Sequence, residues 1–275
     1  MCQPVWKSRV SLLCISVLVC VFSLLVVPID AQQSVQSTQS EPQALQILAQ
    51  ALAAMGGSSA ASQIQDSVVQ GTETSLLPGS TTGNVIIKTN GPDQIRWDSS
   101  SSAGSSSVIV NRGRTMKNRD SRGWKVGPSE NAMHQRPTHL PALLLAYELA
   151  RPDCLVTYVG SEVFQSRQVQ HLELARVFHS GKSKLDAKLT SDSKIEVYVD
   201  AQTLTVSKVS YVLLSDTDWR RGVPLEIEYG NYKVLNGIMV PLTQKIFFNG
   251  RPDSELDITS ASFNTAVPET DFEAN

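Results

Sequence analysis

Cysteine and aromatic residues are scarce in this sequence, and each scarcity excludes a class of protein. The chain has 4 cysteines in 275 residues, and Cys2, Cys14 and Cys20 all lie near the N-terminus. Only Cys154 remains in the rest of the chain, so a disulfide-stapled fold is excluded. We expect Cys154 to pack as an inert residue at the start of a buried strand. Aromatic residues make up 6% of the chain, too few for the aromatic girdles of an outer-membrane barrel.

An excess of charge of one sign is absent as well. The formal net charge is −2 at pH 7. A protein that binds nucleic acid usually carries a basic patch or stripe, and nothing in this balance suggests one. We therefore expect no nucleic acid among the partners.

The motifs that mark active sites are also missing. No serine lies on a glycine-flanked, strand-to-helix turn of the kind that serine hydrolases use. Gly56 and Gly57 follow a predicted helix rather than a strand, so they indicate a helix end and not a phosphate-binding loop. The histidines at positions 134, 139, 171 and 179 fit no metal-ligand spacing. We expect no catalytic residue, no metal and no cofactor, and interpret the protein as non-enzymatic.

The N-terminus has the layout of an export signal. Lys7 and Arg9 precede a mostly apolar run from Val10 to Ile29, and Ala31 offers a small residue for cleavage. We expect a signal peptide over residues 1–31, a disordered spacer over 32–39 and a folded periplasmic domain over 40–275. Because the apolar run is close to the ~20 residues that span a bilayer, an uncleaved inner-membrane anchor is the alternative.

Two principal helices are predicted. The first should begin with Ser40 as its N-cap and end at Gly56, because Leu45, Leu48, Leu52 and Met55 recur at helical spacing between them. The second should span Pro141–Ala150, since proline is favoured in a first helical turn and a second proline follows Arg151. This second helix is apolar on nearly all sides, so a sheet, or a sheet and a ligand, must enclose it.

Most of the remaining chain has the period of two that strands require. Short β-prone runs lie between Val68 and Val126, and the serine-rich tract Ser99–Ser107 within them is predicted to be a flexible hairpin loop. Beyond Cys154, a change of parity near Lys208 predicts a bulge that bends the sheet. Asn-Gly pairs at 236–237 and 249–250 predict tight hairpins. We expect about ten to twelve strands in one domain.

Three segments near the C-terminus carry a family resemblance. They are the strand and turn Tyr198–Leu204, the tyrosine-bearing strand with its Asn-Gly turn Tyr229–Pro241, and the closing Phe263–Thr265 with Phe272. In these segments the chain resembles the superfamily of periplasmic lipoprotein carriers and outer-membrane lipoprotein-sorting proteins, the LolA-like proteins. The resemblance implies a mainly β fold with helices (α+β). Its antiparallel sheet would curl into an incomplete barrel, with helices on the concave face over an apolar cavity.

The same resemblance implies a function. Proteins of this kind carry or receive acylated lipoproteins, so we expect a monomer that binds lipid or lipoprotein acyl chains. The alternative is an envelope sensor or scaffold of the same fold that binds a membrane protein. Strand parity and the apolar helix select the cavity candidates: Trp97, Leu144, Tyr147, Val197, Val199, Val206, Ile227, Tyr229, Ile246 and Phe248. These side chains would otherwise fill one another as an ordinary core.

Overall fold

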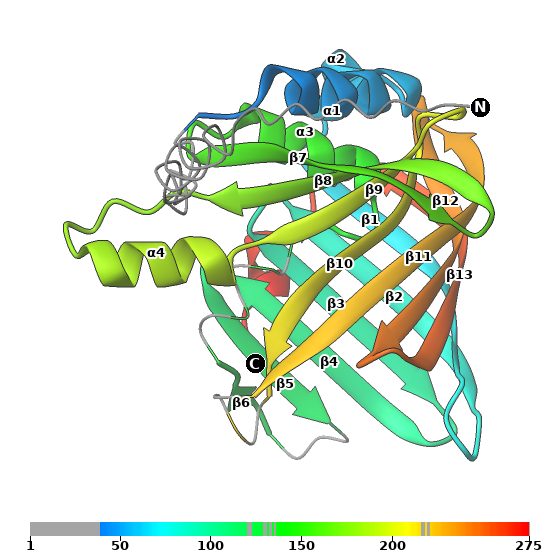
Figure 1. Cartoon of the computed structure of the whole chain (residues 1–275). Helices are drawn as coiled ribbons and strands as arrows, with labels where there is room; N and C mark the ends of the chain where they lie inside the picture. Colours follow the sequence, from blue (N-terminus) through cyan, green and yellow to red (C-terminus); the bar gives the residue numbers. More distant parts are fainter. Residues whose placement is uncertain are drawn as a thin grey trace, which may run out of the picture. The chain divides into compact units, whose positions relative to one another are not determined.

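The strands of the described chain belong to one antiparallel sheet that curls around its own concave face (Figure 1). The computed structural model describes residues 39–119, 123–128, 131, 134, 136–215, 218 and 221–274, which belong to the unit Thr38–Asn275. The predicted signal peptide 1–31 and the predicted spacer up to residue 38 lie outside the described residues.

Strands dominate the order of elements along the chain. The elements are α1 (Pro42–Ala54), α2 (Ser58–Ser62), β1 (Asp66–Ser75), β2 (Thr82–Asn90), β3 (Gln94–Ser101), β4 (Gly104–Asn111), β5 (Arg114–Arg119), β6 (Lys125–Val126), α3 (Pro141–Ala150), β7 (Cys154–Phe164), β8 (Arg167–Arg176), α4 (Ser183–Asp192), β9 (Ile195–Asp200), β10 (Val206–Leu214), β11 (Gly222–Leu235), β12 (Ile238–Phe248), β13 (Arg251–Phe263) and the 3-10 helix η2 (Glu269–Phe272).

The sheet is an incomplete barrel with two open edges. Its 13 strands run in the order β6-β5-β4-β3-β2-β1-β13-β12-β11-β10-β9-β8-β7, so β6 and β7 are the edges. The first strand, β1, pairs with the last, β13, near the middle of the sheet. The predicted α+β class and curled antiparallel sheet are confirmed, and the strand count exceeds the expected range.

Alternation along the strands gives the sheet an apolar concave face. Ile87, Trp97 and Val108 lie side by side on β2, β3 and β4, and Ile227 is opposite Ile246 on β11 and β12. Bulges interrupt several ladders, and a bulge increases local twist and bends its strand. The predicted bulge near Lys208 is confirmed, because the register of β9 and β10 shifts between Val206 and Lys208.

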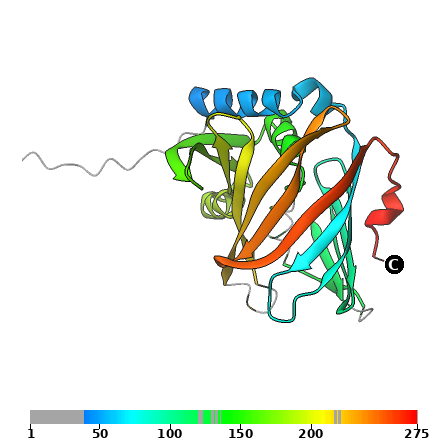
Figure 2. The same cartoon turned by 90° about the vertical axis from the view of Figure 1, so that its right-hand side faces the viewer.

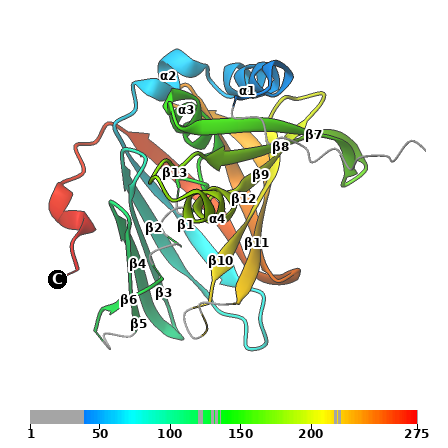
Figure 3. The same cartoon turned by 60° about the vertical axis from the view of Figure 1, so that its left-hand side comes forward.

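Helix α3 occupies the concave side, and α1 and α2 lie over it (Figure 3). Its bounds, Pro141–Ala150, are those predicted, and Leu143, Leu144 and Leu145 are completely buried. The cap of α1 differs from the prediction: Glu41 is the N-cap, and the Ser40 hydroxyl instead accepts a hydrogen bond from the Val156 amide at 3.0 Å. Leu45, expected on the apolar stripe, is exposed. Among the described residues, no helix combines the length and apolar composition needed to cross a membrane.

Two local predictions about loops and helices were wrong. The serine tract is not a loop: β3 and β4 extend through it to a turn at residues 102–103, and the Ser99 and Ser106 hydroxyls are hydrogen-bonded at 2.8 Å. Neither α2 nor α4 was expected. Helix α4 buries no residue, so it has no apolar stripe for the sequence to reveal. The two Asn-Gly hairpins are confirmed, with Asn236, Gly237, Asn249 and Gly250 all at positive φ.

The C-terminal segment lies against the outer face of β3 and β4 (Figure 2). Phe272 of η2 is completely buried there. Arg96 donates to the Asp271 carbonyl at 2.9 Å, and Lys88 pairs with the Asp271 carboxylate at 2.8 Å. These contacts fasten the end of the chain on the side of the sheet opposite to α3.

Candidate functional site

The concave face of the sheet borders a half-open hollow of about 310 Å³, lined mainly by β3, β4 and β10–β12. We call it the inner hollow. Its apolar wall consists of Ile95, Trp97, Val108, Val110, Leu213, Leu225, Ile227, Ile246 and Phe248. Its polar side chains include Arg136 and His139 near α3, Glu73 and Asp253 toward the hairpin ends, and Lys117 of β5. The arrangement therefore offers an apolar wall with separate polar positions.

The structure divides the ten predicted cavity residues into two groups. Four of them line the inner hollow: Trp97, Ile227, Ile246 and Phe248. The other six belong to the hydrophobic core or pack against it without lining the hollow: Leu144, Tyr147, Val197, Val199, Val206 and Tyr229. Leu144 and the three valines are completely buried in the packed core. The assignment of these ten residues to a ligand-binding surface stays a prediction.

A partly buried tyrosine and a buried glutamine hold the segment before α3 inside the curl. The Tyr229 hydroxyl donates to the Thr138 carbonyl at 2.7 Å. The Gln244 amide donates to the His139 carbonyl at 2.9 Å. Arg136 through Leu140 are all buried. Side chains from β11 and β12 thus bring residues 136–139 to the hollow, although they lie about a hundred positions away in sequence.

Arg136 is the charged group at this part of the hollow. Its Nε pairs with Glu148 of α3 at 3.0 Å, and the two side chains are only 7% and 3% exposed. Among the described residues, neither Nη atom of Arg136 has a hydrogen-bond partner, and Oε2 of Glu148 has none. Burial lowers the pKa of Arg136, and the Glu148 carboxylate opposes that shift. A buried donor without a partner costs roughly 1–3 kcal/mol, so this guanidinium is incompletely satisfied.

Two histidines flank the arginine in neutral form. His139 is completely desolvated, which lowers its pKa to about 3, and its ring meets Trp97 edge to face at 6.4 Å. Burial, reinforced by the positive charge of Arg136, lowers the pKa of His134 to about 4. His134 stacks on Tyr211 at 5.6 Å. Both imidazoles are therefore uncharged at neutral pH and add no positive charge beside Arg136.

The other polar position lies toward the hairpin ends of the strands. Burial raises the pKa of Glu73, against hydrogen bonds from Ser254 and Trp97, and the Asp253 carboxylate raises it further. Burial also raises the pKa of Asp253. Ser99 and Ser106, from the tract that was expected to be a loop, line this part as well. The polar side chains here are acidic or hydroxylic, in contrast to the basic group near α3.

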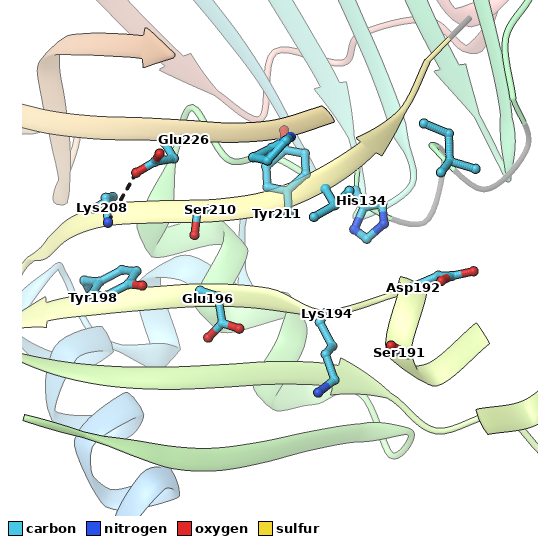
Figure 4. Close-up of a pocket in the computed structure, with 13 residues that line it drawn as sticks. His134, Ser191, Asp192, Lys194, Glu196, Tyr198, Lys208, Ser210, Tyr211 and Glu226 are labelled. Atoms are coloured by element: carbon cyan, nitrogen blue, oxygen red, sulfur yellow. Dashed lines mark hydrogen bonds and ion pairs between the residues drawn. The ribbon is translucent and has the colours of Figure 1, made fainter. Parts of the chain in front are cut away.

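A second, larger pocket of about 580 Å³ is lined mainly by outward side chains of β9–β11 and by the end of α4, and it also reaches His134 and Tyr211 (Figure 4). We call it the outer pocket. Its charged side chains include Lys194, Glu196, Lys208 and Glu226. Lys208 pairs with Glu226 at 3.3 Å and lies over the Tyr198 ring at 4.1 Å. The charged side chains of this pocket are therefore partly neutralised by one another.

The described residues offer little for covalent or metal chemistry. Burial, reinforced by Glu148, raises the pKa of the Cys154 thiol to about 12. A thiol that stays protonated is a poor nucleophile, which agrees with the inert packing expected for it. Within the described ranges, no three His, Cys, Asp or Glu side chains are grouped so that they would hold a metal ion.

Sequence reasoning missed part of the hollow. Val108, Val110 and Leu225 share parity with predicted neighbours, so strand alternation was a signal that would have found them. Arg136, Thr138 and His139 lie in a segment without periodicity. No local pattern pointed to them, because their position depends on distant side chains.

Comparison with known proteins gives likeness at the level of structure only. No protein-family profile and no curated protein matches the sequence. An outer membrane lipoprotein-sorting domain from Vibrio parahaemolyticus is 14% identical with a TM-score of 0.52, covering 84% of this chain and 96% of that chain. A LolA superfamily protein from Nitrosomonas europaea is also 14% identical with a TM-score of 0.52, covering 84% of this chain and 97% of that one. The described unit therefore has the LolA-like fold that the C-terminal segments predicted.

Proposed function

We propose that this chain is an exported, non-enzymatic carrier that holds an acyl chain of a lipid or lipoprotein in the inner hollow. One observation carries the proposal: the concave face of the sheet keeps an unfilled apolar space next to a well-packed core. The fold shared with lipoprotein-sorting domains supports it. The signal-like residues 1–31 support a periplasmic location.

The size of the hollow favours one chain as its occupant. Its volume of about 310 Å³ is at the lower end of the ~300–1,000 Å³ that ligand pockets occupy. Each buried methylene contributes ~0.8 kcal/mol, so ten of them contribute on the order of 8 kcal/mol before the costs of binding are subtracted. A single acyl chain therefore binds usefully without any particular polar contact.

Filling the hollow tests the proposal. Ile246 lines it and is only partly buried, so Ile246→Trp should place an indole in the free space and leave the fold intact. We expect at least tenfold weaker binding of N-phenyl-1-naphthylamine, a neutral fluorescent probe, because about 2 kcal/mol of apolar contact is lost. Val212→Trp, on the exposed outer face, is the matched control. Equal binding by both variants, with unchanged melting temperatures, would contradict an acyl site in the hollow.

The periplasmic location has a separate test. The full chain, expressed in a Gram-negative host, should appear in the osmotic-shock fraction at the mass of residues 32–275. Recovery of the intact mass in the inner membrane would replace the cleaved signal peptide with the anchor alternative.

A second candidate function is a protein-interaction module of the same fold. The observation that favours it is the edge strand β7, where Val159 and Val163 are 52% and 71% exposed. Open strand edges are sites where partner strands add. A photo-crosslinking residue at Val163 should then yield one defined adduct in cells, while the same residue at Val126, 67% exposed on the opposite edge, should yield none. No adduct at either position would remove this candidate.

A further inference from the structure

The described charged side chains around Arg136, with Arg136 itself included, carry one more positive charge than negative charges. Its charged neighbours are Glu148, Arg151 and Arg176. Arg151 and Arg176 share a single carboxylate, Asp153, at 3.0 and 3.3 Å. Glu148 is the partner of Arg136 itself. In this described cluster three guanidinium groups therefore meet two carboxylates, and the Cys154 thiol beside them is neutral.

The Arg136 guanidinium is also a buried group whose hydrogen-bonding capacity is not fully used. Arg136 is buried, it lines the inner hollow, and within the described chain its two Nη atoms have no hydrogen-bond partner. Arg151 and Arg176, by contrast, are more exposed and already paired. A guanidinium presents parallel N–H donors that fit the oxygens of a carboxylate or a phosphate. Such an anion would supply both the missing charge and the missing acceptors.

Neighbouring side chains fit the same occupant. Tyr211 and Thr138 line the hollow beside Arg136 and carry hydroxyl groups. The apolar wall begins at once beyond them, with Leu213, Leu225 and Ile227 on β10 and β11. One position for an anion and one space for an apolar chain are therefore continuous.

We infer that Arg136 binds the anionic head group, a carboxylate or a phosphate monoester, of a single-chain lipid whose tail occupies the inner hollow. This inference rests on the proposed function and adds the class of ligand and its orientation, with the head group toward α3. Arg136 acts here as a binding residue, and Glu148 acts as a positioning residue that holds its Nε.

Displacement of N-phenyl-1-naphthylamine from the purified chain tests the inference. The competitors are laurate, dodecyl phosphate and methyl laurate, which share a chain length and differ in head-group charge. We expect at least one anion to displace the probe at a concentration about tenfold or more lower than methyl laurate requires. A hydrogen bond to a charged group accounts for a difference of this size. The tighter anion identifies the head group.

Removal of the ion pair should abolish that preference. The double variant Arg136→Met, Glu148→Leu replaces both partners by apolar residues, which leaves no unpaired charge in the core. It should bind the anions and methyl laurate within about twofold of each other. Arg151→Met, which removes a nearby guanidinium that does not line the hollow, should keep the wild-type preference.

The outcomes separate this inference from the proposed function. Equal displacement by anions and ester in the wild type would overturn the role of Arg136 and leave an acyl site standing. An anion preference that persists in the folded double variant would also overturn it. A chain that binds neither the probe nor any competitor would overturn both proposals.

Discussion

The inner hollow and the outer pocket share Tyr211 but are lined mainly by opposite faces of β10 and β11, and the charged side chains on these two faces are paired to different extents. On the outer face, Lys194 pairs with Glu173 at 2.8 Å, and His171 contacts both Glu162 and Glu196 at 2.7 Å. On the inner face, Arg136 has one partner and two Nη atoms without any among the described residues. The outer-face side chains Lys194 and His171 are thus paired, whereas the Arg136 guanidinium is only partly satisfied.

The largest expected effect follows from removing the buried positive charge on the inner face. Arg136→Met alone leaves Glu148, 3% exposed, as a buried carboxylate without its partner. Loss of one member of a buried pair costs about 3–5 kcal/mol, to be measured as the change in unfolding free energy in urea at pH 7. The double variant Arg136→Met, Glu148→Leu should recover most of that loss. A single variant as stable as the wild type would mean that Glu148 is not charged in the folded protein.

Lowering the pH should also destabilise the folded protein through a residue of the inner face. His139 has a pKa of about 3 in the folded chain, against about 6.5 when unfolded. The unfolded state therefore binds more protons below pH 6.5, and stability falls as the pH drops from 6.5 toward 3. The loss from this residue is on the order of 3 kcal/mol between pH 6.5 and 4.

A variant isolates that histidine. His139→Phe keeps an aromatic ring beside Trp97 and removes the titrating group, so its stability should fall less steeply over the same pH window. His179→Gln, at an exposed position, is the control and should retain the wild-type profile. Parallel profiles for His139→Phe and the wild type would show that His139 is not held neutral.

The smallest loss of stability is expected for an ion pair on the outer face, and it would sharpen the contrast with Arg136. Lys194 and Glu173 are 32% and 20% exposed, and partly exposed pairs contribute about 1 kcal/mol or less. Lys194→Met should therefore lower the unfolding free energy by less than about 1 kcal/mol. The difference from wild type should shrink further in 1 M salt. A loss as large as that of Arg136→Met would remove the distinction between the two faces.

Elements with local signals were predictable from the sequence. Helix α3 has its predicted bounds because prolines at 141 and 152 restrict the backbone wherever they occur. The hairpins at Asn236-Gly237 and Asn249-Gly250 follow from the positive φ that these residues tolerate. Strand parity also predicted that Trp97, Ile227, Ile246 and Phe248 would line one hollow. Side chains alternate between the two faces of a strand whatever strand lies beside it.

Elements that depend on distant partners were not predictable. The serine tract becomes strand because β2 and β5 flank it on either side, and strand formation depends on such neighbours more than on intrinsic preference. Arg136 and His139 reach the hollow only through Tyr229 and Gln244. Their role is a property of tertiary structure, so the basic position of the candidate site left no trace in the sequence.

The pairing of β1 with β13 has a consequence for how the chain folds. The strands that join the two halves of the sheet, Asp66–Ser75 and Arg251–Phe263, come from opposite ends of the described chain. Proteins dominated by such long-range pairings fold slowly, because the entropy of closing the loop must be lost before the contacts form. One edge of β1 therefore stays without its strand partner until the last strand of the described chain is in place.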